Sequence, residues 1–116
     1  MQPLQVYTSP TPNGFKVSIF CEELKKAYPD FQVEYKEISL GKNEQKTESF
    51  LKINPNGRIP AMVDPNRNNF AVFESAAILL YLEKHYDPKH IFSWASTDPK
   101  ADDLRSEALQ VIFFAQ

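Results

Sequence analysis

Cysteine and histidine are scarce in this sequence, which has one Cys and two His among its 116 residues. A single thiol excludes an internal disulfide framework and favours a reducing compartment. Cys21 falls on the apolar stripe of a predicted helix, so we expect it to be a buried structural thiol. His85 and His90 have no other metal-ligating residues at suitable spacing, so we expect both in a surface or linker position and expect no metal.

The sequence also lacks a basic surplus and a long apolar run. The formal net charge is −2, whereas a nucleic-acid or anionic-membrane surface is expected to be basic. No apolar run reaches membrane-spanning length, and no basic leader precedes Leu4–Tyr7 as in a secretory signal. With 42% hydrophobic and 24% charged residues, the composition is that of a globular protein. We therefore expect a cytoplasmic protein that binds neither nucleic acid nor membrane.

The first half of the chain predicts a strand–helix–strand unit followed by a short helix. Strands are expected at Leu4–Thr8 and Gln32–Ile38, on either side of a helix over Phe15–Tyr28. Residues at i, i+3, i+4 and i+7 form one apolar stripe on this helix: Val17, Phe20, Cys21, Leu24 and Tyr28. Such units are most often parallel and right-handed. A short irregular helix over Thr47–Lys52 is expected to bury its apolar side.

The stretch Phe50–Ser75 organises the rest of the chain. Its turn residues lead into a predicted strand at Ala61–Asp64. The polar segment Asp64–Asn69 contains a proline and predicts a turn. Phe70–Phe73 is then expected to form a second strand, antiparallel to the first, and apolar residues at helical spacing predict a helix that runs to Tyr86.

Two features of this stretch favour a binding site. The Ile59-Pro60 bond belongs to the one class that adopts cis at low cost. A cis bond would leave the N–H and C=O of Ile59 facing outward, where a peptide-like ligand can pair with them. Ser75 begins a helix, but Ile78 stands where a capping box requires a carboxylate. Some N–H groups at this helix start are therefore expected to be free to bind an anion.

The C-terminal part predicts a linker over Asp87–Pro99 and a helix over Lys100–Gln116. Asp98 suits the N-cap of that helix and Pro99 its first position. Three apolar side chains are expected to pin the linker to the domain: Ile91, Phe92 and Trp94. The expected apolar side of the helix consists of Leu104, Ala108, Val111, Ile112 and Ala115.

Three runs of residues resemble one protein family. NPNGRIPAMVD at positions 54–64 and ESAAILLYLEKHY at 74–86 resemble the glutathione-binding half of cytosolic glutathione transferases. TPNGFKV at positions 11–17 is most similar to the fungal branch related to the yeast nitrogen-regulatory prion protein. The resemblance covers Leu4–Tyr86, and its specific signal is the pair Ile59-Pro60 and Glu74-Ser75 in this order and at this separation.

This resemblance implies the fold and the organisation of the chain. The fold is expected to be α/β, a thioredoxin-like βαβ-α-ββα domain with a mixed four-stranded sheet. Residues 1–86 would form the glutathione-binding domain, residues 87–99 a linker, and residues 100–116 the first helix of an all-helical domain. We expect a truncated form of a transferase that uses glutathione as co-substrate and acts as a homodimer on a small electrophile or peroxide.

The resemblance also suggests how the thiol of glutathione is activated. Thioredoxin-like oxidoreductases carry C-x-x-C before the first helix, but this chain has PNGF there, so disulfide exchange through a protein thiol at this corner is excluded. Asn13 is expected to donate to the glutathione sulfur, with the N–H of Gly14 at the same helix start. Asn13 also suits an N-cap or turn, and the hydroxyls of Tyr7, Ser9 and Thr11 stay open as alternatives.

The remaining site residues follow from the same resemblance. The backbone of Ile59, next to Pro60, is expected to pair with the cysteinyl part of glutathione. Glu74 would bind the γ-glutamyl ammonium and Ser75 its carboxylate, and Arg58 would be a further contact. The glycyl carboxylate is assigned to the Gly41–Lys46 loop, where the candidates are Lys42 and Asn43, with Gln45 and Lys46 as alternatives.

Two other interpretations compete with a transferase. A non-catalytic glutathione-binding or regulatory module would have the same fold and the same binding residues. A stand-alone interaction domain that binds no glutathione would require the Glu74-Ser75 match to be chance.

Overall fold

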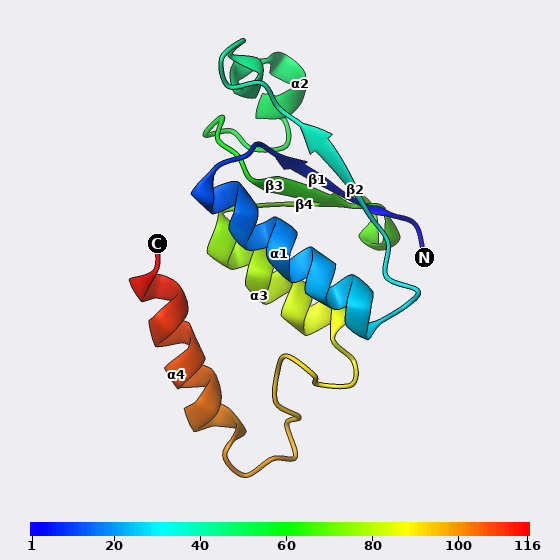
Figure 1. The fold of residues 1–116 in the computed structure, drawn as a ribbon, viewed down its shortest axis with the longest axis vertical. Helices are drawn as coiled ribbons and strands as arrows, with labels where there is room; N and C mark the ends of the chain where they lie inside the picture. The colour runs from blue at the N-terminus through cyan, green and yellow to red at the C-terminus, as the bar shows by residue number, and fades with distance from the viewer.

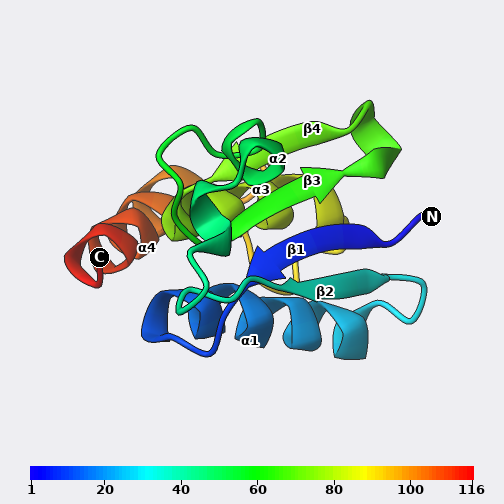
Figure 2. The same cartoon turned by 90° about the horizontal axis from the view of Figure 1, so that it is seen from above.

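The computed structural model describes all residues from Met1 to Gln116 and is built on one mixed sheet of four strands in the order β2-β1-β3-β4. Parallel pairing joins β1 (Leu4–Thr8) to β2 (Val33–Glu37). Antiparallel pairing joins β1 to β3 (Ala61–Asp64). It also joins β3 to β4 (Phe70–Phe73), as predicted. The sheet and its element order confirm the expected thioredoxin-like α/β fold (Figure 2).

Two long helices, α1 (Pro12–Ala27) and α3 (Ser75–Tyr86), lie side by side against one face of the sheet (Figure 1). Alternate residues of a strand point to the same face, so β1 directs Leu4 and Val6 toward these helices while Tyr7 points away. The core between sheet and helices contains nine buried residues: Leu4, Val6, Val17, Cys21, Leu24, Phe31, Met62, Ile78 and Leu82. The predicted apolar stripe of the first helix is therefore confirmed, with Phe20 and Tyr28 packed at its margin.

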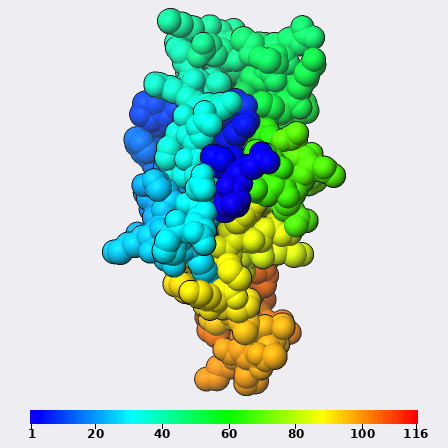
Figure 3. All heavy atoms as spheres, turned by 90° about the vertical axis from the view of Figure 1, so that its right-hand side faces the viewer, coloured from blue at the N-terminus to red at the C-terminus, as the bar shows by residue number.

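The molecule is elongated, with principal extents of 48 × 32 × 23 Å (Figure 3). The short helices η1 (Glu44–Lys46) and α2 (Glu48–Leu51) occupy one end, and the linker and α4 (Ala101–Phe114) occupy the other (Figure 1). A further turn, η2 (Pro65–Arg67), joins β3 to β4. No helix has both the length and the apolar character needed to cross a membrane.

Two predicted helix starts were wrong. The first helix begins at Pro12, three residues earlier than expected, because Thr11 caps it and proline fits the first helical position. The last helix begins at Ala101, because Asp98 accepts the N–H of Lys100 at 2.8 Å in a preceding turn and is not the N-cap. Its predicted apolar side was also partly wrong, since Val111 is 67% exposed.

The linker is tied to the domain by one aromatic side chain and one carboxylate. Phe92 packs edge-to-face on Phe20, with ring centroids 5.4 Å apart, whereas Ile91 and Trp94 are exposed, so only part of the predicted apolar anchor is confirmed. Asp87, which is 2% exposed, accepts the backbone N–H groups of Ile91 and Phe92 at 2.9 and 2.8 Å. These bonds fix the path of the chain from α3 toward α4.

Candidate functional site

A small cavity of about 70 Å³ lies where several chain segments meet. The start of α1, the loop before β3, the start of α3 and the residue after Ala115 contribute its lining: Asn13, Asn54, Arg58, Ile59, Pro60, Glu74, Ser75 and Gln116. Six of the eight residues assigned from the sequence are thus brought together. The two that do not line the cavity are Lys42 and Asn43.

The start of α3 is organised around Glu74 and Ser75. Glu74 has a positive φ of 75° and no side-chain hydrogen bond caps the helix, as expected from the missing capping box. A positive φ is uncommon for a residue other than glycine and is often found at functional sites. Ser75 is 4% exposed, and its Oγ donates to Oε1 of Gln116 at 2.8 Å. None of the three ion pairs of the molecule involves Glu74, so its carboxylate is available to a cation.

The loop before β3 presents free backbone groups to the same cavity. The Ile59-Pro60 peptide bond is cis, and Ile59 makes no backbone hydrogen bond within the chain. Asn54, which is 2% exposed, holds the loop by donating to the carbonyl of Arg58 at 2.8 Å and accepting the N–H of Asn56 at 3.0 Å. The buried amide of Asn54 therefore positions the segment that carries Ile59.

The first turn of α1 places Asn13 at the cavity, while Thr11 caps the helix. Asn13 is exposed and is not the N-cap. The N–H of Gly14 donates to Thr11 Oγ1 at 3.2 Å, so it is engaged within the helix start. Gly14 is required for packing, because a Cβ there would lie 2.3 Å from the carbonyl oxygen of Ser9.

The hydroxyl alternatives to Asn13 are engaged elsewhere. Thr11 is the cap of α1, and Ser9, which is 7% exposed, donates its Oγ to the carbonyl of Ile38. Tyr7 lies on the other face of the sheet, edge-to-face with Phe50 at 5.9 Å, and does not line the cavity. The arrangement therefore favours Asn13 among the four candidates, although its role stays a prediction.

Cys21 has no access to this site. It is fully buried on α1, and burial, with a smaller contribution from the charge of Glu22, raises the pKa of its thiol to about 12. The reactive form of a cysteine is the thiolate, so a thiol with this pKa stays protonated and inert at neutral pH. The prediction of a buried structural thiol is confirmed.

The loop assigned to the glycyl carboxylate lies beside the cavity but does not line it. Lys42 and Asn43 are both exposed, and the N–H of Lys42 donates to Ser39 Oγ at 3.3 Å. Lys46 reaches further toward the site, because its Nζ donates to the carbonyl of Asn56 at 3.2 Å. It packs on Gly57, whose φ of 60° and lack of a side chain allow this close approach. Among the loop cations, Lys46 is the one connected to the segment that carries Arg58.

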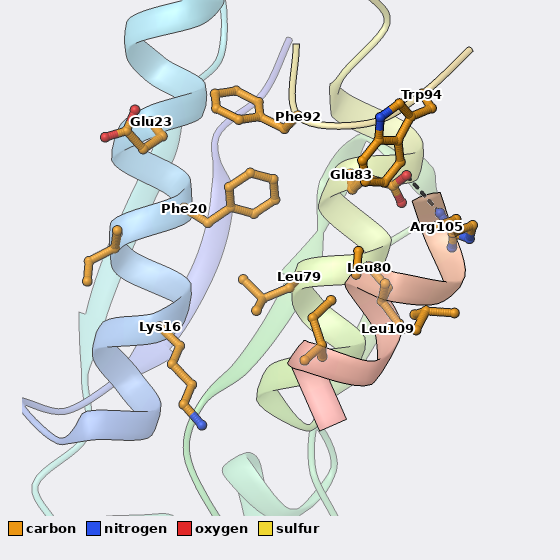
Figure 4. Close-up of a pocket in the computed structure, with 13 residues that line it drawn as sticks. Lys16, Phe20, Glu23, Leu79, Leu80, Glu83, Phe92, Trp94, Arg105 and Leu109 are labelled. Carbon is orange, nitrogen blue, oxygen red and sulfur yellow. Dashed lines mark hydrogen bonds and ion pairs between the residues drawn. The ribbon is translucent and has the colours of Figure 1, made fainter. Parts of the chain in front are cut away.

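A larger apolar groove of about 490 Å³ runs between α1, α3 and α4 (Figure 4). Its walls include Phe20, Leu79, Leu80 and Leu109, and at one margin Arg105 pairs with Glu83 at 2.8 Å. The groove and the small cavity adjoin along the three helices. Lys16, Leu79 and Ile112 line the groove, one helical turn from Asn13, Ser75 and Gln116 respectively.

Comparison with known proteins identifies the family. The family model described as glutathione S-transferase, N-terminal domain, matches residues 2–84. The chain belongs to the glutathione S-transferase family. It is 38% identical over 114 residues to a glutathione S-transferase-like protein, tpcF, of Aspergillus fumigatus, covering 98% of this chain and 45% of that protein. It is 40% identical over 89 residues to the protein URE2 of Saccharomyces bayanus, covering 73% of this chain and 24% of that protein.

A solved structure with the same fold carries glutathione. The glutathione transferase homolog from Lodderomyces elongisporus, crystallised with two GSH per subunit, superposes with a TM-score of 0.83 at 37% identity, covering 98% of this chain and 50% of that one. The chain therefore spans about half or less of the length of these relatives. The predicted family and its fungal, URE2-related branch are confirmed.

Two residues of this transferase-family site were not foreseen in their present roles. Asn54 was predicted only as a turn residue. An Asn side chain that accepts the backbone N–H two residues later is a known turn motif. Gln116 follows α4, whose placement depends on tertiary packing, so no local pattern places it beside Ser75.

Proposed function

We propose that the chain binds glutathione in the small cavity and activates its thiol for attack on electrophiles or peroxides. The observation that carries this proposal is the convergence of Asn13, Ile59, Glu74 and Ser75 on one cavity from three separate segments. These four residues offer a thiol-directed amide, a free backbone strand segment, a carboxylate and a hydroxyl at a helix start. A γ-glutamyl-cysteinyl ligand has groups that match each of them.

The γ-glutamyl end occupies the cavity itself. At about 70 Å³ the cavity is small for a tripeptide. It therefore suits the charged end of the tripeptide and not the whole ligand. Glu74 binds the ammonium, Ser75 and the uncapped start of α3 bind the α-carboxylate, and the free backbone groups of Ile59 pair with the cysteinyl residue. Arg58 lies at the same opening.

Thiol activation is assigned to Asn13. Its position in the first turn of α1 places an amide donor and the positive end of the helix dipole near the sulfur. A donor aimed at the sulfur lowers its pKa and increases the fraction of nucleophilic thiolate. The electrophile is then expected in the adjoining apolar groove, since Lys16 and Leu79 connect that groove to the cavity.

The proposal also covers the glycyl end of glutathione and the assembly of the protein. The glycyl carboxylate binds the Gly41–Lys46 loop through Lys42 and Asn43, or through Lys46. The chain acts as a cytoplasmic homodimer in detoxification. The edge strand β4 supports self-association, since it exposes 57% of Phe70 and 36% of Phe73.

Calorimetry of glutathione binding tests the proposal. Hydrogen bonds to charged groups contribute about 1.5–3 kcal/mol, so Ser75→Ala should weaken glutathione binding about tenfold or more. Ser106→Ala, on the exposed side of α4, is the matched control and should bind like the wild type. Unchanged affinity in a folded Ser75→Ala variant would remove the assignment.

A non-catalytic glutathione-binding or regulatory module is the second candidate, favoured by the similarity to URE2 proteins. Turnover of a chlorinated nitrobenzene or a hydroperoxide with glutathione separates the two, because a binding module shows affinity without turnover. Failure to be retained on immobilised glutathione would contradict both.

A further inference from the structure

The C-terminal end of α4 delivers a side-chain amide to the start of α3. Ser75 Oγ donates to Gln116 Oε1 at 2.8 Å across 41 positions of sequence. Because Ser75 is 4% exposed, its hydroxyl has little access to solvent and is directed into the shared cavity, where Gln116 is its partner. Gln116 is therefore part of the same polar site as Glu74 and Ser75.

Contacts with α1 and with α3 hold α4 in place, and they hold the amide of Gln116 with it. Lys16 Nζ on α1 donates to the carbonyl of Ala115 at 3.0 Å. One end of the helix is thus fastened beside the cavity, and the Arg105–Glu83 pair at 2.8 Å fastens its first half to α3. Gln116 Nε2 lies 3.4 Å from the carbonyl of Ile112, which is a long and weak hydrogen bond. The Nε2 group therefore has only this weak partner within the chain.

The chemistry of an amide differs from that of the groups around it. A carboxylate can only accept hydrogen bonds, so a carboxylate that takes the Ser75 hydroxyl displaces Gln116 Oε1. The side chain of Gln116 then presents Nε2, which carries two N–H donors. Rotation of the terminal torsion exchanges oxygen and nitrogen without moving the helix.

We propose that Gln116 is a specificity residue for glutathione, whose Nε2 donates to the α-carboxylate of the γ-glutamyl group beside Ser75. This inference rests on the proposed function. Ser75 and Gln116 hydrogen-bond to each other while the site is free, and both donate to the carboxylate when the ligand is bound. A ligand without that carboxylate leaves the Ser75–Gln116 bond intact and gains nothing from Gln116.

The test is calorimetric binding to the full chain with two ligands. The first is glutathione, and the second is 4-aminobutanoyl-cysteinylglycine, which lacks only the α-carboxylate. Hydrogen bonds to charged groups are stronger than neutral ones, so Gln116→Ala should weaken glutathione binding about fivefold to tenfold after loss of the Ser75 bond is counted. The same variant should bind the second ligand within about twofold of wild type.

Two further variants complete the experiment. Gln116→Glu should weaken glutathione binding more than Gln116→Ala, because a carboxylate offers no donor and repels the ligand carboxylate. Gln110→Ala, at an exposed position of α4, should bind both ligands like the wild type.

The outcomes separate this inference from the function on which it rests. Tighter glutathione binding by Gln116→Ala would overturn it, because the residue would then only compete for Ser75. Equal losses for both ligands would also overturn it, since they would indicate a structural effect on α4. Both results leave glutathione binding by the wild-type chain, and with it the proposed function, intact. A wild-type chain that binds no glutathione would overturn the proposed function and the role of Gln116 together.

Discussion

Replacing Asp87 should destabilise the protein more than any exposed substitution, because one buried carboxylate serves four donors. It accepts the N–H groups of Ile91 and Phe92, the hydroxyl of Ser93 at 2.7 Å and the hydroxyl of Tyr28. In Asp87→Ala the two hydroxyls can turn toward water, but the two backbone N–H groups lose their acceptor. Each unsatisfied buried donor costs about 1–3 kcal/mol, so the free energy of unfolding should fall by about 3–5 kcal/mol.

The pH dependence of this effect has a definite sign. Burial by itself raises the pKa of Asp87, but the bonds from Tyr28, Ser93 and the two backbone N–H groups outweigh it and lower the pKa below its ordinary value of 3.8. A lowered folded-state pKa means that the stabilisation is fully present above the unfolded-state pKa, and is lost as pH falls through the folded-state pKa. The advantage of wild type over Asp87→Asn should therefore be constant from pH 7 to about pH 5 and shrink below about pH 4.

Urea unfolding followed by circular dichroism measures both effects. Asp87→Asn should lose about 2 kcal/mol at pH 7, because its amide keeps one acceptor and places an NH₂ group against donors. Asp30→Asn, at an exposed position, is the matched control and should change stability by less than about 0.5 kcal/mol. A loss below about 1 kcal/mol for Asp87→Ala would refute the reasoning, since the N–H groups of the linker would then have found other acceptors.

Two further predictions concern the site and the apolar surface. Asn13→Ala should leave glutathione affinity nearly unchanged, raise the pKa of the bound thiol and slow the chemical step. The measurement is the ultraviolet absorbance of the thiolate against pH. Coincident curves for wild type and variant would show that Asn13 does not activate the thiol. A polypeptide of residues 1–116 should self-associate, because it exposes 67% of Val111, 63% of Phe113 and 90% of Phe114. Light scattering should detect this association, and the double variant Phe113→Ser, Phe114→Ser should associate less. A stable wild-type monomer at high concentration would contradict the prediction.

Much of the fold could be predicted because local patterns and tertiary burial agree. Alternating apolar residues and short apolar runs between turns placed all four strands to within a few residues, and apolar residues at helical spacing did the same for the helices that cover them. The start of α1 was misplaced because Thr11 and Pro12 were assigned to a loop on their turn propensity. The same two residues are a good N-cap and first helical residue.

The site was predictable only where its residues belong to motifs. Ile59 and Pro60, like Glu74 and Ser75, could be assigned because each pair is adjacent in sequence and the resemblance fixes the separation between pairs. Gln116 could not, because its position depends on how α4 packs on α1 and α3. The predicted apolar side of α4 included Val111, which is exposed, and this error in the helix face shows the same limitation.

The arrangement of helix ends explains why a zwitterionic thiol peptide suits this corner of the fold. The N-termini of α1 and α3 and the C-terminal end of α4 meet at the small cavity. Helix N-termini carry partial positive charge, which favours anionic groups beside them. Under the proposed function, the thiolate faces α1, the α-carboxylate faces α3, and the ammonium lies beside Glu74. Gln116 adds no charge to this pattern, and its amide, which both donates and accepts, can serve the free site and the bound site.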